Sequence, residues 1–299
     1  MDVNAEAWPE LPLEKWKDTR DTLHLWMQMV GKIRLKLAPY LNHWWQVPLY
    51  VTSRGLTTTS IPFGGREFDV TFDFIDHTLI IQTSDARSEQ IPLQPRSVAG
   101  FYRELMASLH RLGIDVKIWT VPSEIPQAIR FEEDTQHASY DAVYAHRAWR
   151  VLLAADEIFK EFRGRFIGKA SPVHFFWGGF DLAVTRFSGR RAPERVGADR
   201  ITREGYSHEL SSCGFWFGSG SLTEPAFYSY AVPEPPGFKE TQMRPAAASY
   251  NTEFSIFVLP YDDVRQAADP RGTVLDFLQS TYEAAATLGR WDRENLERA

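Results

Sequence analysis

An amphipathic helix pattern that occurs twice, 176 residues apart, restricts the fold more than any other feature of the sequence. Ser97 precedes the first copy as a capping residue, and Gly113 ends it. Thr273 and Gly289 hold the same places around the second copy. The paired positions of the inner face are Val98, Phe101, Leu105, Leu109 and Leu112, and Val274, Phe277, Thr281, Ala285 and Leu288. Spacings of three and four put each set on one face of a helix.

Further matches precede both helices in the same order. An upstream amphipathic helix is expected over residues 23–37 in the first copy and 148–166 in the second. An aromatic strand entrance with a histidine follows, as His43-Trp44-Trp45 and as His174-Phe175-Phe176-Trp177. Each entrance leads to a Val-Thr pair, a basic residue and a glycine. Ordered recurrence of several features predicts two copies of one ancestral unit.

Between these landmarks the chain has the patterns of antiparallel strands. Residues 68–74 and 79–81 alternate around a turn at Asp76-His77, which predicts a hairpin. Residues 212–217, 226–232 and 253–258 are aromatic-rich strands of the second copy. We predict the α+β class, with two diverged helix–antiparallel sheet–helix units packed as a pseudo-twofold duplication.

The same reasoning divides the chain into a first repeat (1–121), a connector (122–138) and a second repeat with longer loops (139–299). Because the connector is short, one continuous domain is the alternative. Long loops in the second repeat favour that half as the location of a site.

Composition limits the classes of function. The net charge of -6 opposes nucleic-acid binding, and the basic residues between 186 and 203 alternate with acidic ones, as in a solvated loop. No apolar run reaches the length of a membrane span, and no secretory signal precedes Trp8. Cys213 is the only cysteine, so no internal disulfide forms. We therefore expect a cytoplasmic protein that binds neither membranes nor nucleic acid.

The candidate catalytic residues are His43, His174, His208 and Glu209. If the copies pack about a twofold axis, His43 and His174 converge, and imidazoles in an aromatic cleft are suited to acid–base chemistry. The alternative is that each histidine only bonds the backbone. Three imidazoles also suit a metal ion, so any metal would be bound by His43, His174 and His208. The sequence identifies no cofactor, and Cys213 is either a nucleophile or, more ordinarily, a buried side chain.

Ten tryptophans provide candidates for a ligand-binding wall, with an aromatic core as the alternative. Arg54 or Arg186 is expected to bind an anionic group. The candidate ligand-binding residues are Trp44, Trp45, Arg54, Trp177, Asp181, Arg186 and Trp216.

The chain resembles a bacterial family described only as a domain of unknown function. The resemblance rests on Trp8-Pro9, Asn42-His43-Trp44-Trp45, Val51-Thr52-Ser53-Arg54-Gly55-Leu56, Phe72-Asp73-Phe74-Ile75-Asp76-His77, Tyr206-Ser207-His208-Glu209, and residues 171–178, 180–191 and 276–283. It covers nearly the whole chain and implies no reaction, substrate or cofactor.

These features support three hypotheses of function. The first is an enzyme for a small polar or aromatic molecule, with histidines as acid–base or metal-binding groups. The second is a protein that binds such a molecule without catalysis, and the third is a structural or partner-binding protein. The sequence leaves open whether the protein is an enzyme and what its oligomeric state is.

Overall fold

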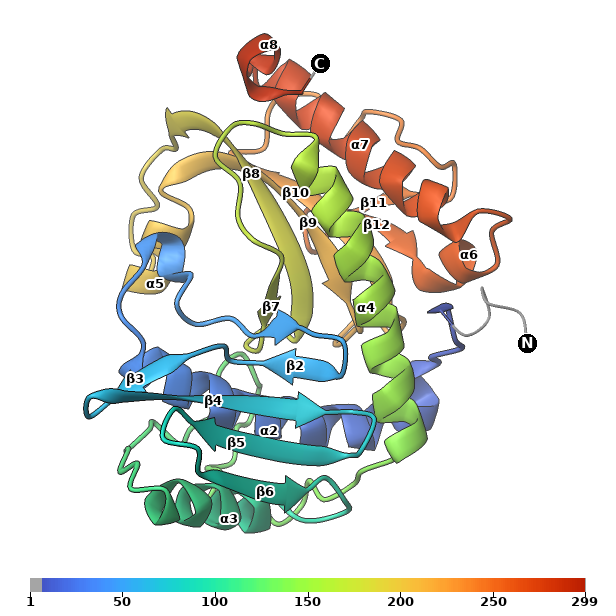
Figure 1. The fold of residues 1–299 in the computed structure, drawn as a ribbon. Helices are drawn as coiled ribbons and strands as arrows, with labels where there is room; N and C mark the ends of the chain where they lie inside the picture. The colour runs from blue at the N-terminus through green and yellow to red at the C-terminus, as the bar shows by residue number, and fades with distance from the viewer. Residues whose placement is uncertain (1–6, 299) are drawn as a thin grey trace.

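The computed structural model describes residues 7–298, so the first six residues of the predicted first repeat and Ala299 lie outside it. Helices and two antiparallel sheets make up the structure, which confirms the α+β class (Figure 1). Within residues 7–298, no helix is both long enough and apolar enough to cross a bilayer.

The first sheet lies between two helices in the chain order. Its strands run in the spatial order β1, β2, β4, β5, β6, and β3 also pairs with β4. The bounds are β1 Tyr50–Val51, β2 Gly55–Thr57, β3 Ile61–Phe63, β4 Arg66–Asp73, β5 Thr78–Thr83 and β6 Ser88–Pro92. The helices before and after the sheet are α2 Leu13–Leu37 and α3 Val98–Arg111. These two helices pack against each other, and α3 also packs against β6.

The second sheet has the spatial order β7, β8, β9, β10, β12, β11. The bounds are β7 His174–Phe176, β8 Asp181–Arg191, β9 His208–Trp216, β10 Ala226–Val232, β11 Ser249–Asn251 and β12 Ile256–Pro260. Two long helices, α4 Ala142–Gly164 and α7 Pro270–Leu288, pack against it and against each other. The short helices are η1 Asn42–Trp44, α5 Arg200–Gly205, α6 Tyr261–Arg265 and α8 Arg293–Leu296.

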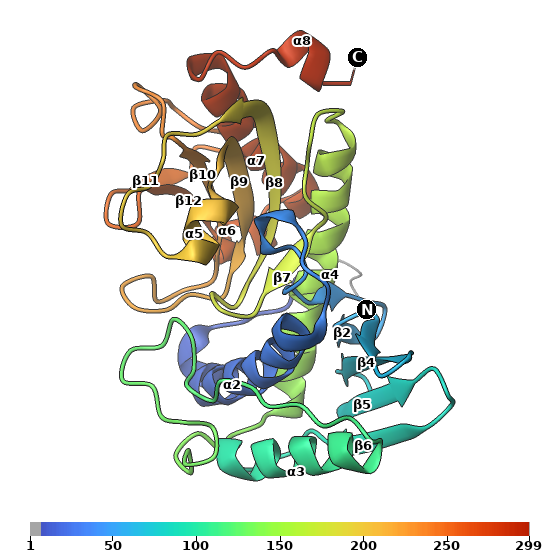
Figure 2. The ribbon, with the colours of Figure 1, turned by 90° about the vertical axis from the view of Figure 1, so that its left-hand side faces the viewer.

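The two faces of the second sheet have different coverings. Successive side chains of a strand point to opposite faces. On β8, Arg186 points toward α4 and stacks on the Phe162 ring, whereas Asp181 and Thr185 belong to the other face. Figure 2 shows α5 on the side of β9 away from α4. The face under α5 is therefore covered by short segments rather than by long helices.

The two sheets meet at their edge strands. Leu49 and Phe175 exchange both backbone hydrogen bonds, each with an N–O distance of 2.9 Å. Helix α4 runs along both sheets and contacts α2, β1 and β8 (Figure 1). On α2, His24 Nε2–H donates to the Trp177 carbonyl at 2.8 Å. Buried apolar side chains of both halves form one continuous cluster.

Most of the predicted helices and strands are present, and the Ser97 hydroxyl caps α3 by accepting from the Gly100 N–H. The second helix begins earlier than predicted, at Pro270, because Asp269 rather than Thr273 is its capping residue. Proline at the first helical position fits this start, since its missing N–H needs no partner there. The predicted strand at 253–258 begins only at Ile256.

The prediction that His43 begins an aromatic strand is wrong. His43 lies in η1 and, like Trp44, has a left-handed backbone, with φ values of 56° and 61°. His174 does begin a strand, β7. The predicted equivalence of the two entrances therefore does not extend to their local structure, and the pseudo-twofold duplication stays a prediction.

Gly31 of α2 gives a test of how closely the halves pack. A Cβ at Gly31 would lie 2.2 Å from Trp177 Nε1. Alanine usually stabilises a helix by about 1 kcal/mol relative to glycine. We expect Gly31→Ala to destabilise the protein by about 1–3 kcal/mol instead, because of overpacking. Gly164→Ala at the end of α4, where nothing lies within 4 Å of the new Cβ, should have no cost. Chemical denaturation of both variants measures this difference, and equal effects would contradict it.

Candidate functional site

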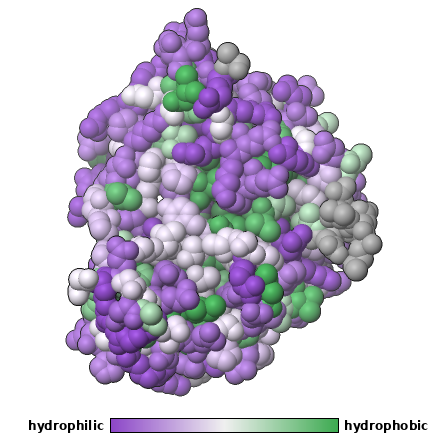
Figure 3. Space-filling view, viewed as in Figure 1, coloured by the Kyte–Doolittle hydropathy of each residue, from purple (hydrophilic) through white to green (hydrophobic). Residues whose placement is uncertain are grey.

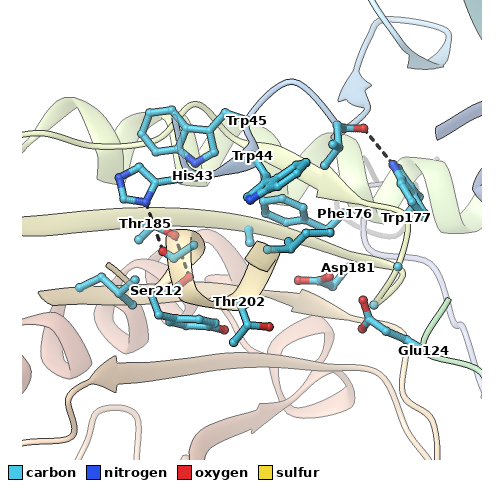
Figure 4. Close-up of a pocket in the computed structure, with 18 of the residues that line it drawn as sticks. His43, Trp44, Trp45, Glu124, Phe176, Trp177, Asp181, Thr185, Thr202 and Ser212 are labelled. Carbon is cyan, nitrogen blue, oxygen red and sulfur yellow. Dashed lines mark hydrogen bonds between the residues drawn. The ribbon is translucent and has the colours of Figure 1, made fainter. Parts of the chain in front are cut away.

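A cavity of about 540 Å³ lies on the face of the second sheet that α4 and α7 leave uncovered (Figure 4). Strands β8, β9 and β10 form its floor. Segments from β7, η1, α5 and the stretch around residue 124 form its walls. The surface viewed in Figure 3 is mostly hydrophilic, with hydrophobic residues gathered near its centre. Most residues that line the cavity belong to the second half. The first half contributes η1 together with Leu35, Trp45 and Val47.

Two carboxyl groups define one end of the cavity. Asp181 is the first residue of β8, and the Tyr228 hydroxyl donates a hydrogen bond to its carboxylate. Burial raises the pKa of Asp181 to about 7, and the charge of Glu124 adds to the rise although the bond from Tyr228 opposes it. Partial burial also raises the pKa of Glu124, whose side chain keeps contact with solvent. The Asp181 carboxyl therefore changes its protonation state near neutral pH.

Close approaches at two glycines make this end possible. A Cβ at Gly178 would lie 2.3 Å from Glu124 Oε1. A Cβ at Gly214 would lie 2.5 Å from the Tyr228 hydroxyl oxygen. Gly214 thereby lets the Tyr228 ring lie across β9 and reach Asp181. Glu124 itself has a left-handed backbone with φ 58°, an uncommon conformation for a non-glycine residue.

Hydroxyl groups and aromatic rings occupy the middle of the cavity. Thr185 Oγ1 and Ser212 Oγ, on adjacent strands, are hydrogen-bonded at 2.9 Å. Further along the floor, the hydroxyls of Tyr206 and Tyr230 are 3.2 Å apart. Other lining rings are Trp44, Trp45, Phe176 and Phe187. This lining offers flat apolar walls with a few polar anchoring points, as small-molecule sites do.

His43 defines the other end of the cavity. Its Nδ1 lies 3.1 Å from the Glu204 carbonyl oxygen, and its Nε2 lies 2.7 Å from Lys169 Nζ. Because the ammonium group can only donate, Nε2 accepts and Nδ1–H donates to the carbonyl. Burial lowers the pKa of His43, and the charge of Lys169 lowers it further. His43 is therefore a neutral imidazole with both nitrogens engaged.

The structure brings His208 close to His43, with ring centroids 5.6 Å apart. His208 Nδ1 lies 3.0 Å from the Ser207 hydroxyl. Burial lowers the pKa of His208, with smaller effects from Lys169 and Arg191. Of the predicted imidazoles, these two are neighbours.

His174 does not join them. Its side chain is fully buried and does not line the cavity, and the Trp45 ring contacts both His174 and His43. Neither ring nitrogen of His174 has a hydrogen-bond partner within residues 7–298. Over the same residues, no group of three or more His, Cys, Asp or Glu side chains is arranged to hold a metal ion. The predicted convergence of His43, His174 and His208 is wrong, because an indole ring lies between two of them.

Several predicted site residues have structural partners away from the cavity. Arg54 is paired with Asp73 and Asp76 of the first sheet. Glu209 accepts from Ser188 and is paired with Arg190. Neither Arg54 nor Glu209 lines the cavity.

Arg186, another predicted ligand-binding residue, lies on the opposite face of the sheet from the cavity. It is 1 % exposed on the helix-covered face, and its guanidinium carbon lies 3.5 Å from the Phe162 ring centroid and 4.3 Å from that of Tyr282. Trp216 packs edge-on against Phe254. Neither residue lines the cavity.

Among the predicted ligand-binding residues, Trp44, Trp45, Trp177 and Asp181 do line the cavity. Cys213 faces the opposite side of the sheet, where burial raises the pKa of its thiol to about 12, so it is not a nucleophile near neutral pH. Sequence reasoning missed Glu124, Tyr228 and Thr185. Alternation along β8 from Asp181 identifies Thr185, but no local pattern indicates Glu124.

Comparison with known proteins agrees with the motifs noted in the sequence. The model of a family of unknown function, DUF5996, matches residues 8–298. The chain belongs to this family. No curated protein and no solved structure shows a significant match. The family itself is defined without a function, so the site must be interpreted from its own geometry.

His174 gives a test of the buried-imidazole environment. Burial, with smaller effects from Arg34 and Arg163, lowers its pKa from 6.5 to about 3. Between these two pH values the unfolded chain binds a proton that the folded chain does not, so stability falls as the pH falls. The slope approaches about 1.4 kcal/mol per pH unit for one such group. Apolar replacement removes this contribution.

We therefore expect His174→Leu and His174→Phe to flatten the loss of stability between pH 6.5 and about 3. The two replacements are both apolar but differ in shape and size, so a shared effect on the pH dependence is electrostatic rather than steric. His24, whose pKa burial lowers to about 4, should retain part of the acid dependence. Urea denaturation at several pH values measures the slope, and an unchanged slope in both variants would contradict the assignment.

Proposed function

We propose that the protein binds a small organic molecule in the cavity on the second sheet. The ligand has a flat apolar body and carries a cationic or hydrogen-bond-donating group. The observation that carries this proposal is the Asp181 carboxyl, held by Tyr228 in the wall of an aromatic cavity beside Glu124. A volume of about 540 Å³ lies in the usual range for small-molecule sites.

The polarity of the cavity supports an oriented ligand. Asp181 and Phe187 face the cavity from the same strand, and six residues of strand span about 20 Å. The two carboxyl groups lie at the Asp181 end, and neutral His43 contacts Phe187 at the other. Cations are attracted both by carboxylates and by aromatic faces. A cationic group is therefore expected at the Asp181 end, with the flat body along the hydroxyl and aromatic floor.

A second candidate function is catalysis by proton transfer. A carboxyl with a pKa of about 7 is suited to act as a general acid or base at neutral pH. This moves the acid–base role from His43, whose nitrogens are both engaged, to Asp181. Turnover that follows one ionisation near pH 7, is lost in Asp181→Asn and survives in His174→Leu would favour an enzyme over a non-catalytic binding protein.

We also propose that the two halves descend from one helix–sheet–helix unit. In support, five successive antiparallel strands stand between two long helices in each half: β1, β2, β4, β5 and β6 in one, and β7, β8, β9, β10 and β12 in the other. Strands β3 and β11 are then additions. On this proposal a site formed on only one of two sheets is an acquired property of the second half.

Three probes that share a phenyl ring test the ligand's charge. We expect 2-phenylethylamine to bind at least about tenfold tighter than phenylacetate, with 2-phenylethanol between them, because charge-assisted hydrogen bonds are the strong ones. Ionisation of Asp181 as the pH rises through about 7 should tighten binding of the amine. Calorimetric titration or tryptophan fluorescence measures the affinities across this range.

Asp181→Asn should reduce the preference for the amine and remove the step in its pH dependence near 7. Asp69→Asn is the matched control, because burial also raises the pKa of Asp69 but that residue lies on β4 of the first sheet. The proposal would be contradicted by affinities that do not depend on the charge of the probe, or by an equal loss of amine affinity in both variants.

A further inference from the structure

A second pocket opens beside the cavity and shares His43 with it. Its volume is about 470 Å³. It lies between η1, helix α5 and the start of β9, and it is open to solvent. The lining residues are Asn42, His43, Lys169, Arg191, Arg200, Arg203, Glu204, Ser207 and His208. We call this the basic pocket.

The charge of the basic pocket is strongly one-sided. Four of its lining residues are Lys or Arg, and Glu204 is the single carboxylate among them. The two carboxylate oxygens of Glu204 already accept from the Tyr40 hydroxyl and the His43 backbone N–H. Such a concentration of positive charge is unexpected in a chain with a net charge of -6. Like charges gathered without counter-charge disfavour the empty protein and attract an anion.

Lys169 is hydrogen-bonded to His43, but two other cations of this pocket have no carboxylate partner in the described structure. Within residues 7–298, no carboxylate is paired with Arg191 or Arg203. By contrast, Arg190 on the same strand as Arg191 is paired with Glu209 and donates to the backbone carbonyls of Gly289 and Arg290, just after α7. Arg200 lies over the Tyr40 and Trp44 rings, which hold it at the pocket's edge. The contrast separates structural arginines from available ones.

Other polar groups complete the lining. Asn42 provides a side-chain amide, whereas the Ser207 hydroxyl already donates to the Glu204 carbonyl at 2.7 Å. The pKa of the His208 imidazole is lowered by burial and by Lys169 and Arg191. An anion placed among these groups would reverse that effect on His208. Guanidinium groups present parallel N–H donors that match the oxygens of phosphate, and the Asn42 amide is a further donor for a remaining oxygen.

We propose that the basic pocket binds a phosphate-class anion. The basic pocket contains neither Asp181 nor Glu124, so anion binding there does not depend on what the neighbouring cavity binds. If the proposed function also holds, the shared His43 places the anion at the end of the cavity opposite Asp181. The ligand is then a small molecule with a phosphate at one end and a cationic or donor group at the other.

Inorganic phosphate is the first probe. At constant ionic strength, titration of the full chain should give saturable binding by calorimetry and an upward shift of the His208 pKa by NMR. Arg191→Gln and Arg203→Gln should each weaken binding at least about tenfold, since each removes a charge-assisted bond. Arg195→Gln is the matched control, because Arg195 lies in the same segment but stacks on Tyr206 outside the basic pocket. Absence of saturation, or equal weakening by the control, would overturn the site.

Phenyl phosphate is the second probe. If a ligand spans both pockets, phenyl phosphate should bind more tightly than inorganic phosphate. Leu210→Ala should reduce that gain while leaving phosphate binding intact, because Leu210 lines the cavity but not the basic pocket. If inorganic phosphate binds but phenyl phosphate binds no more tightly, the proposal of one ligand spanning both pockets is overturned and the anion site is not. If the unmodified protein binds 2-phenylethylamine but not inorganic phosphate, the anion site is overturned and the proposed function is not.

Discussion

Two backbone hydrogen bonds, exchanged between Leu49 and Phe175, determine where the site forms. They fix the chain of the first half to the edge of the second sheet. The segment that leads to Leu49 must then pass over the sheet face that α4 and α7 leave open, and this segment contains η1. His43 reaches the cavity for that reason, and the Glu204 carbonyl and carboxylate hold it there from α5. The cavity is a consequence of covering one sheet face with short segments rather than a long helix.

The two ends of the cavity have opposite electrostatic character. At one end Asp181 and Glu124 share a partly desolvated space. At the other, burial and the charge of Lys169 lower the pKa of His43. Beyond His43 the basic pocket extends the positive end. A field of this kind orients any ligand that carries separated charges before it makes short-range contacts. On the proposed function, orientation by this field would add selectivity to a lining rich in aromatic rings.

Local sequence patterns predicted the long helices and the β4–β5 hairpin, because periodicity and capping are properties of neighbouring residues. The site depended on information that such patterns lack. His43 and Trp44 adopt left-handed backbones only because η1 is held against α5, so their aromatic run resembled a strand. The neighbour of Arg186 on β8, Thr185, faces the cavity, whereas Arg186 itself faces α4. The packing of α4 decides which face of the strand is covered by the long helix. Glu124 comes from a segment without periodicity and is placed by tertiary contacts alone.

The buried environment of Asp181 destabilises the folded chain at neutral pH. Its folded pKa lies near 7 and its ordinary value is 3.8, so between these pH values the folded chain holds a proton that the unfolded chain has released. Stability therefore declines as the pH rises through this range. His174 acts in the opposite direction, losing stability as the pH falls below 6.5. An acidic group kept in a destabilising position at neutral pH is typical of a site selected for binding or catalysis rather than for stability. A cationic ligand beside Asp181 would offset this cost, which gives binding a driving force that the empty cavity lacks.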